Sequence, residues 1–227
     1  IALGRLNRLL EARESYQSAL SVTPQRIDIL YNLAINLSKE KKHEQAIKAY
    51  RKVIAEQPLN FNARLSLAQS LIDISEIEKA EEILTDLKVP KDFESTSYFL
   101  QGKIKEAKLD FIEAKKSYLQ AVELRPDFAL AHQATGIIFT KLNQTQKAIA
   151  AFRTAIHFDQ SCIEARLGIA NSYELSGLYE LAIASYKEIA KFDENPEALF
   201  RLAKCYKVIG NKAEAIDFCN KALAIDK

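Results

Sequence analysis

The chain has 227 residues and a net charge of +2, with 27% charged and 48% apolar residues. This balance indicates a folded, soluble protein, and the small net charge gives no field that would draw the chain to nucleic acid. Only 6 Gly and 5 Pro occur, which excludes a collagen, a linker and a many-stranded β-protein, and no apolar run approaches the ~20 residues that cross a bilayer.

The chain holds three cysteines and three histidines, namely Cys162, Cys205, Cys219, His43, His132 and His157. The cysteines form no C-x-x-C pair and the histidines are scattered, so the sequence predicts no metal site and no cofactor. Two cysteines fall on predicted core positions, where a free thiol acts as a small apolar residue. This pattern favours a reducing compartment such as the cytoplasm.

An alanine recurs every 34 residues, and once after 33, at Ala12, Ala46, Ala80, Ala114, Ala148, Ala182 and Ala215. Four residues after each alanine stands a larger or apolar residue: Tyr16, Tyr50, Leu84, Tyr118, Phe152, Tyr186 and Cys219. A further apolar residue follows three positions later. Because spacings of four and three residues return to one face of a helix, each alanine marks an amphipathic helix.

A second apolar pattern precedes each of these helices and predicts a first helix in every unit. In residues 27–60 it reads Leu30-x-x-Leu33-Ala34-x-x-Leu37. Residues 1–26 are predicted to hold the end of one first helix and a complete second helix. Between the two helices of a unit we expect turns at residues that tolerate a positive φ, namely Asn7, Ser75, Asn143, Gly177 and Gly210.

The whole pattern, ending in a proline such as Pro58, resembles the tetratricopeptide repeat. The resemblance implies an all-α fold, a right-handed α-α superhelix or solenoid of antiparallel helix pairs. It divides the chain into a partial repeat at 1–26 and repeats at 27–60, 61–94, 95–128, 129–162, 163–195 and 196–227. The 95–128 repeat is the weakest match, because Lys105 replaces an aromatic residue and Gln101 an apolar one, so we expect its first helix to be shifted or bent.

Neither end of the chain carries the extra polar helix that normally caps a solenoid. We therefore expect a portion of a longer protein. Self-association through the uncapped ends is a further expectation about its partners.

In this family the first helices line a concave groove that receives a peptide or a helix of a partner protein. Carried over by position, one row of that groove consists of Tyr31, Leu65, Phe99, Gln133, Leu167 and Phe200. The alternative is that this row packs between adjacent first helices. The other candidate groove residues are Asn32, Ile35, Gln69, Lys103, Ile137, Asn171, Arg201, Lys204 and Lys207.

The last first helix carries the basic residues Arg201, Lys204 and Lys207. They are candidates for holding a carboxylate or phosphate, and the alternative is a solvated basic face beside Glu197. The carboxylate clamp of chaperone-binding relatives is excluded, because no three consecutive repeats supply its asparagines and cations.

The sequence contains no phosphate loop, HExxH motif or nucleophile elbow, so no catalytic residue is predicted and the chain itself is not an enzyme. The favoured function is a protein–protein interaction scaffold that helps to assemble a larger complex. The alternative is the recognition arm of a larger enzyme, such as a glycosyltransferase.

Overall fold

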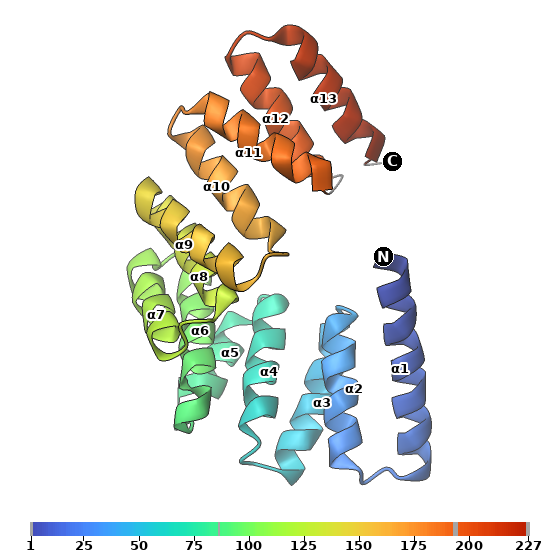
Figure 1. The fold of residues 1–227 in the computed structure, drawn as a ribbon. Helices are drawn as coiled ribbons and strands as arrows, with labels where there is room; N and C mark the ends of the chain where they lie inside the picture. Colours follow the sequence, from blue (N-terminus) through green and yellow to red (C-terminus); the bar gives the residue numbers. More distant parts are fainter. Residues whose placement is uncertain (1, 86, 193–194, 226–227) are drawn as a thin grey trace. The chain divides into compact units, whose positions relative to one another are not determined.

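The computed structural model describes residues 2–85, 87–192 and 195–225, and every regular element in those ranges is an α-helix (Figure 1). The chain divides into two compact units, residues 1–110 and residues 111–227. The first unit contains α1 (Ala2–Val22), α2 (Ile27–Lys39), α3 (His43–Glu56), α4 (Phe61–Asp73), α5 (Ile77–Thr85) and α6 (Lys91–Ala107). The second contains α7 (Phe111–Leu124), α8 (Ala129–Lys141), α9 (Thr145–Phe158), α10 (Ile163–Leu175), α11 (Tyr179–Phe192), α12 (Pro196–Val208) and α13 (Lys212–Ile225). The predicted all-α class is therefore confirmed for the described residues.

Each predicted repeat from residue 27 onward contains two of these helices, and most pairs contact each other directly, as α2 contacts α3 and α10 contacts α11. The boundary between the two units falls between α6 and α7, inside the weakly matching repeat 95–128. Helix α6 begins at Lys91, ahead of that repeat, because Pro90 cannot continue a helix and so sets its start. The predicted repeat boundaries themselves stay a prediction, and residues 193–194 and 226–227 lie outside the described residues.

Residues 1–26 differ from the expectation at one point. Helix α1 runs without a break from Ala2 to Val22, so the turn predicted at Asn7 is wrong. Nothing between residues 2 and 22 stops the helix. That range contains no proline and only Gly4 near its start, and an asparagine alone costs little inside a helix.

The turns between paired helices each contain one residue with a positive φ. These residues are Lys41, Ser75, Leu109, Asn143, Gly177 and Gly210, with φ between 57° and 84°. Four of the predicted turn residues are thereby confirmed. Lys41 and Leu109 were not predicted, since their side chains give no sign of a left-handed conformation.

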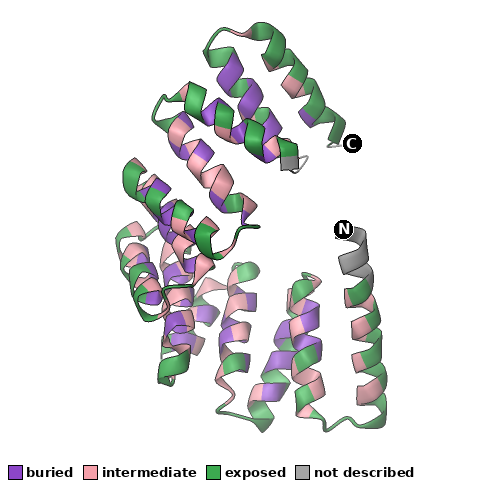
Figure 2. Ribbon diagram, viewed as in Figure 1, coloured by how far each residue is buried: buried purple, intermediate pink, exposed green. Residues whose placement is uncertain are grey.

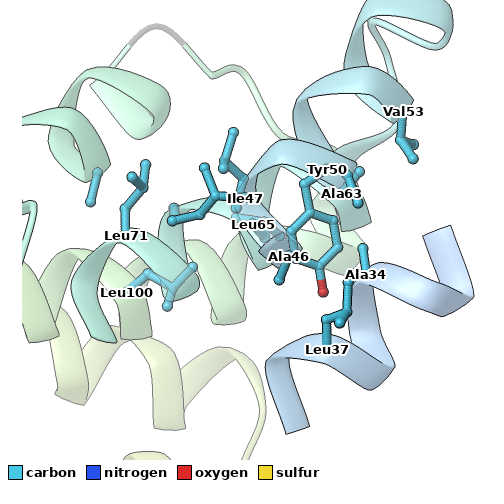
Figure 3. Close-up of a cluster of buried hydrophobic side chains, with 14 of the residues drawn as sticks. Ala34, Leu37, Ala46, Ile47, Tyr50, Val53, Ala63, Leu65, Leu71 and Leu100 are labelled. Atoms are coloured by element: carbon cyan, nitrogen blue, oxygen red, sulfur yellow. The ribbon is translucent and has the colours of Figure 1, made fainter. Parts of the chain in front are cut away.

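The registered alanines mark the core. Those from Ala46 to Ala182 are completely buried, whereas Ala12 and Ala215 in the outermost repeats are only partly buried. Figure 2 shows the same contrast between helices, since α2 and α3 carry buried segments and the described side chains of α1 do not. In the first unit, the Tyr50 ring lies beside Ala46 with its hydroxyl directed at α2 (Figure 3). That hydroxyl lies 3.4 Å from Ser38 Oγ, so the buried phenol keeps a polar partner.

One aromatic ring joins three consecutive helices of the second unit. Phe152 of α9 is buried, and its ring lies directly over Gly136 of α8 and Gly168 of α10. A β-carbon at Gly136 would stand 2.6 Å from the ring, and one at Gly168 only 2.4 Å away. Because carbon atoms in ordinary contact are about 3.5–4.0 Å apart, only glycine fits at these two positions.

Candidate functional site

The apolar row predicted to face a partner is largely packed within the first unit. Leu65 is 5% exposed and belongs to the core, while Tyr31 and Phe99 are half-buried against it. The Tyr31 ring lies with its centroid 6.1 Å from that of Tyr50. The packing alternative therefore describes these residues well, and Tyr31 and Phe99 retain part of their surface for contact.

In the second unit the same row becomes more exposed towards its end. Gln133 is half-buried and accepts a hydrogen bond from the Cys162 thiol, with 3.4 Å between Oε1 and Sγ. Leu167 is half-buried against the core, whereas Phe200 is 58% exposed. Equivalent positions in the repeat thus differ in exposure because they differ in what packs over them.

Two polar candidates of the first unit, Gln69 and Lys103, lie beside an acidic residue of the same predicted groove. Asp73, at the end of α4, accepts a hydrogen bond from the Gln69 amide and lies 3.6 Å from Lys103 Nζ. On the neighbouring α2, Asn32 is exposed and Ile35 is half-buried. This part of the first helices therefore presents amide, charged and apolar groups together.

Two basic residues of α12, Arg201 and Lys204, contact a buried carboxylate of the predicted groove. Glu174 of α10 is buried, and its Oε1 lies 2.8 Å from Lys204 Nζ. Its Oε2 accepts a hydrogen bond of 3.0 Å from the Tyr186 hydroxyl and lies 3.4 Å from an Arg201 guanidinium nitrogen. Arg201 also donates to the side-chain oxygen of Asn171 at 3.0 Å. Both carboxylate oxygens of Glu174 therefore have hydrogen-bond donors, which come from α11 and α12.

The charges of this cluster are fixed by their surroundings. Burial alone would raise the pKa of Glu174, but the hydrogen bonds from Lys204 and Tyr186 and the two nearby cations lower it overall. Burial, reinforced by the Glu174 charge, raises the pKa of Tyr186 well above its ordinary value. Glu174 is thus ionised at neutral pH and Tyr186 remains a hydrogen-bond donor.

This arrangement corrects the interpretation of Arg201, Lys204 and Lys207 as one basic cluster. Arg201 and Lys204 both pair with Glu174 from the preceding repeat, and Arg201 also pairs with Glu197 at 3.0 Å, so they are neither a ready anion site nor a simple solvated face. Lys207 remains exposed beside them. The available signal was the acidic residue near the end of the preceding first helix, which sequence reasoning did not place opposite α12.

The remaining candidate is Ile137 of α8, which is half-buried against the core around Phe152. Within the described ranges, no three His, Cys, Asp or Glu side chains gather in a way that could hold a metal ion. None of the described helices has the length and apolar character to span a bilayer.

Family models described as tetratricopeptide repeat match residues 37–92, residues 99–161 together with 141–195, and residues 196–227. The chain belongs to the tetratricopeptide-repeat family. The registered alanines, the paired helices and the family matches agree on this assignment.

This tetratricopeptide-repeat chain has curated relatives that are much longer. It is 23% identical over 197 residues to the BBSome complex member BBS4 of Bos taurus, covering 86% of this chain and 38% of that protein. It is 28% identical over 229 residues to the protein O-mannosyl-transferase TMTC1 of Homo sapiens, covering 93% of this chain and 26% of that protein. The chain therefore spans less than two fifths of either relative.

Among solved structures, the chain is similar to one in the crystal structure of the APC/C hetero-tetramer Cut9-Hcn1. The TM-score is 0.81 at 16% identity, covering 96% of this chain and 43% of that one. At this identity the likeness concerns the fold, which it supports as a tetratricopeptide-repeat solenoid.

Proposed function

We propose that this chain is a protein-interaction scaffold that binds a peptide or helix of a partner protein along its first helices. The observation that carries the proposal is the mixed character of α2 and α4: the exposed amide of Asn32 and half-buried Ile35 lie about one turn apart on α2, and half-buried Gln69 lies on α4. An amide can donate to and accept from a peptide backbone, while a half-buried isoleucine gives apolar contact. The family assignment is consistent with this use.

A photo-crosslinking experiment tests which face meets the partner. A photoreactive amino acid is placed at Asn32 or Gln69 on the first helices, and at Lys52, which is exposed on the second helix α3, as the matched control. We expect one partner to be captured from positions 32 and 69 and not from position 52.

The double variant Asn32→Ala with Ile35→Ser then checks the energetics with the captured partner in purified form. Losing one apolar contact and one amide should weaken binding roughly tenfold, or about 1.4 kcal/mol. Capture from position 52 alone, or unchanged affinity of the double variant, would contradict the proposal.

A second candidate is the recognition arm of a larger enzyme, and the observation that favours it is the match to the protein O-mannosyl-transferase TMTC1. The first-helix amides give it little support, since Asn171 is already bonded to Arg201. Sequencing the complete gene decides between the two functions. An adjoining catalytic domain supports the enzyme arm, and flanking repeats alone support the scaffold.

A further inference from the structure

The turn between α10 and α11 carries three leucines at positions where the other repeats carry mostly polar residues. Leu175, Leu178 and Leu181 stand seven, four and one positions before the registered Ala182. One position before the other registered alanines, the residues are Glu11, Gln45, Lys79, Glu113, Lys147 and Glu214. Four positions before they are Arg8, Lys42, Glu76, Asp110, Gln144 and Asn211, and seven positions before they are Arg5, Lys39, Asp73, Ala107, Lys141 and Val208. The three leucines are therefore a property of this repeat and not of the repeat pattern.

All three leucines are exposed, although repeats pack on both sides of them. Leu175 is 67% exposed, Leu178 45% and Leu181 50%. Helix α10 contacts α9 of the preceding repeat, and α11 contacts α12 of the following one. The exposure of these side chains therefore does not depend on the end of the chain. Three exposed leucines in one turn form an apolar patch, here called the leucine patch, and a patch of this kind marks a surface for contact.

Hydrogen bonds hold the turn that presents the leucine patch. Gly177 takes the positive φ of 72° that the turn requires. The backbone amide of Leu178 donates to the Tyr173 carbonyl at 3.0 Å. The Ser176 hydroxyl donates to Thr145 Oγ1 at 3.3 Å and so ties the turn to the start of α9. The leucines are therefore presented by an ordered turn.

Lysines flank the leucine patch on both sides. In the preceding repeat, exposed lysines occupy the positions equivalent to the first and last of the three leucines. The turn between α12 and α13 lies at the same end of its helix pair as the turn between α10 and α11 (Figure 1), and it carries two more. The four lysines are Lys141, Lys147, Lys207 and Lys212. Within residues 141–147, 174–181 and 207–214 the exposed carboxylates are Glu180 and Glu214, so the cations outnumber them.

The shape of the leucine patch bears on what it contacts. The leucines protrude from the end of a helix pair, and they line neither of the two cavities found along α12 and α13. A protein partner would need a hollow that matches a protruding turn, whereas the surface of a bilayer accepts protruding leucines without one. Their apolar side chains then leave water, and the flanking ammonium groups stay among the lipid headgroups. Cations beside the apolar side chains complement anionic headgroups.

We propose that the turn between α10 and α11 binds the surface of a membrane that contains anionic phospholipids. The leucine patch enters the boundary between headgroups and acyl chains, and the flanking lysines pair with lipid phosphates. This is contact with one face of a bilayer, and none of the described helices needs to span it. The surface is separate from Asn32 and its neighbours on α2 and α4, so the proposal does not rest on the function proposed above.

Co-sedimentation of the chain of residues 1–227 with lipid vesicles tests the proposal. One set of vesicles contains phosphatidylcholine and phosphatidylserine in equal parts, and the other contains phosphatidylcholine alone. We expect binding to the mixed vesicles to be at least tenfold tighter. Added salt should weaken it, because salt screens the lysines. Lys141→Gln together with Lys147→Gln should also weaken binding to the mixed vesicles, by about tenfold.

Two triple variants locate the contact. Replacing the leucine patch by Leu175→Gln, Leu178→Gln and Leu181→Gln should weaken binding to the mixed vesicles at least tenfold, because less apolar surface leaves water. The matched control replaces three exposed leucines that lie away from the turns between paired helices, and it should bind as wild type does. These leucines are Leu119, Leu130 and Leu223. Circular dichroism checks that both variants keep their helices.

A tryptophan probe gives an independent readout, because the chain contains no tryptophan of its own. The emission of a Leu178→Trp variant should shift to shorter wavelength when mixed vesicles are added, since the indole leaves water. Leu130→Trp, at an exposed position on α8, should show no shift.

Several results would overturn the proposal. These are failure to bind the mixed vesicles, binding that the leucine-patch variant leaves unchanged, an equal loss in the control variant, or emission of Leu178→Trp that does not shift. Light scattering covers another occupant. A concentration-dependent dimer that the leucine-patch variant abolishes, without binding to vesicles, would assign the patch to a second copy of this chain.

Discussion

The apolar face that α10 and α11 present to α12 and the apolar face of α12 and α13 are built from equivalent residues and differ in what lies over them. In the first, Ile183 and Tyr186 are buried and Glu174 has three partners. In the second, Ile216 stands exposed, and among the described residues of α13 only Ala222 is buried. The comparison teaches that the position of a residue within a repeat fixes the direction of its side chain. The neighbouring repeat decides whether that side chain is core or surface.

The largest effect should come from introducing the same polar residue at the two isoleucines. Ile183→Ser leaves a cavity and a buried hydroxyl, and we expect it to lower the free energy of unfolding by about 3 kcal/mol. Ile216→Ser changes an exposed side chain and should cost less than about 0.5 kcal/mol. Urea denaturation followed by circular dichroism measures both. Similar losses in the two variants would show that the α13 face is packed in solution.

The buried contact between α9 and α10 should also have no room for one added carbon. Gly168→Ala places a β-carbon against the Phe152 ring, and we expect a loss of about 2 kcal/mol from overpacking. Phe152→Leu removes the ring, so Gly168→Ala should cost much less in that background. A double-mutant cycle by thermal or urea denaturation checks this coupling, and strictly additive losses would argue that the ring does not contact Gly168.

The smallest of the three effects concerns the charged position that differs between the two faces. Glu174→Gln removes the carboxylate that Arg201 and Lys204 share and should cost about 1–2 kcal/mol at pH 7. Lys207→Gln, at the equivalent position of the second face, should leave the free energy of unfolding unchanged.

The same variant predicts a pH dependence. Because folding lowers the pKa of Glu174, its stabilisation is present above the ordinary glutamate pKa and is lost as the pH falls through the lowered value. The difference between wild type and Glu174→Gln should therefore shrink in acid. Equal differences at pH 7 and pH 3 would mean that the ion pairs do not stabilise the fold.

The repeat architecture could be predicted from the sequence because its signals are local. The register of the alanines indicates the core face of each helix, and residue types such as Asn143 and Gly177 indicate the turns. Both signals lie within single repeats. Leu109 could not be predicted, since a leucine at φ 62° is held there by the helices on either side of the turn.

The candidate site was less predictable because its properties depend on contacts between repeats. Leu65 and Phe200 share one position in the pattern, yet only Phe200 is exposed. Glu174 and Lys204 lie 30 residues apart, and their pairing depends on how α12 sits against α10. A repeat pattern gives the face that a residue occupies but not the chemical group placed opposite it.

The ring of Phe152, wedged over Gly136 and Gly168, implies a constraint on how this sequence can diverge. The residues at these three positions depend on one another, although they lie on three helices and in two repeats. A lineage that gains a side chain at either glycine must also shrink the ring, and one that restores the ring must regain both glycines. Natural variants of this chain should therefore change at these positions together.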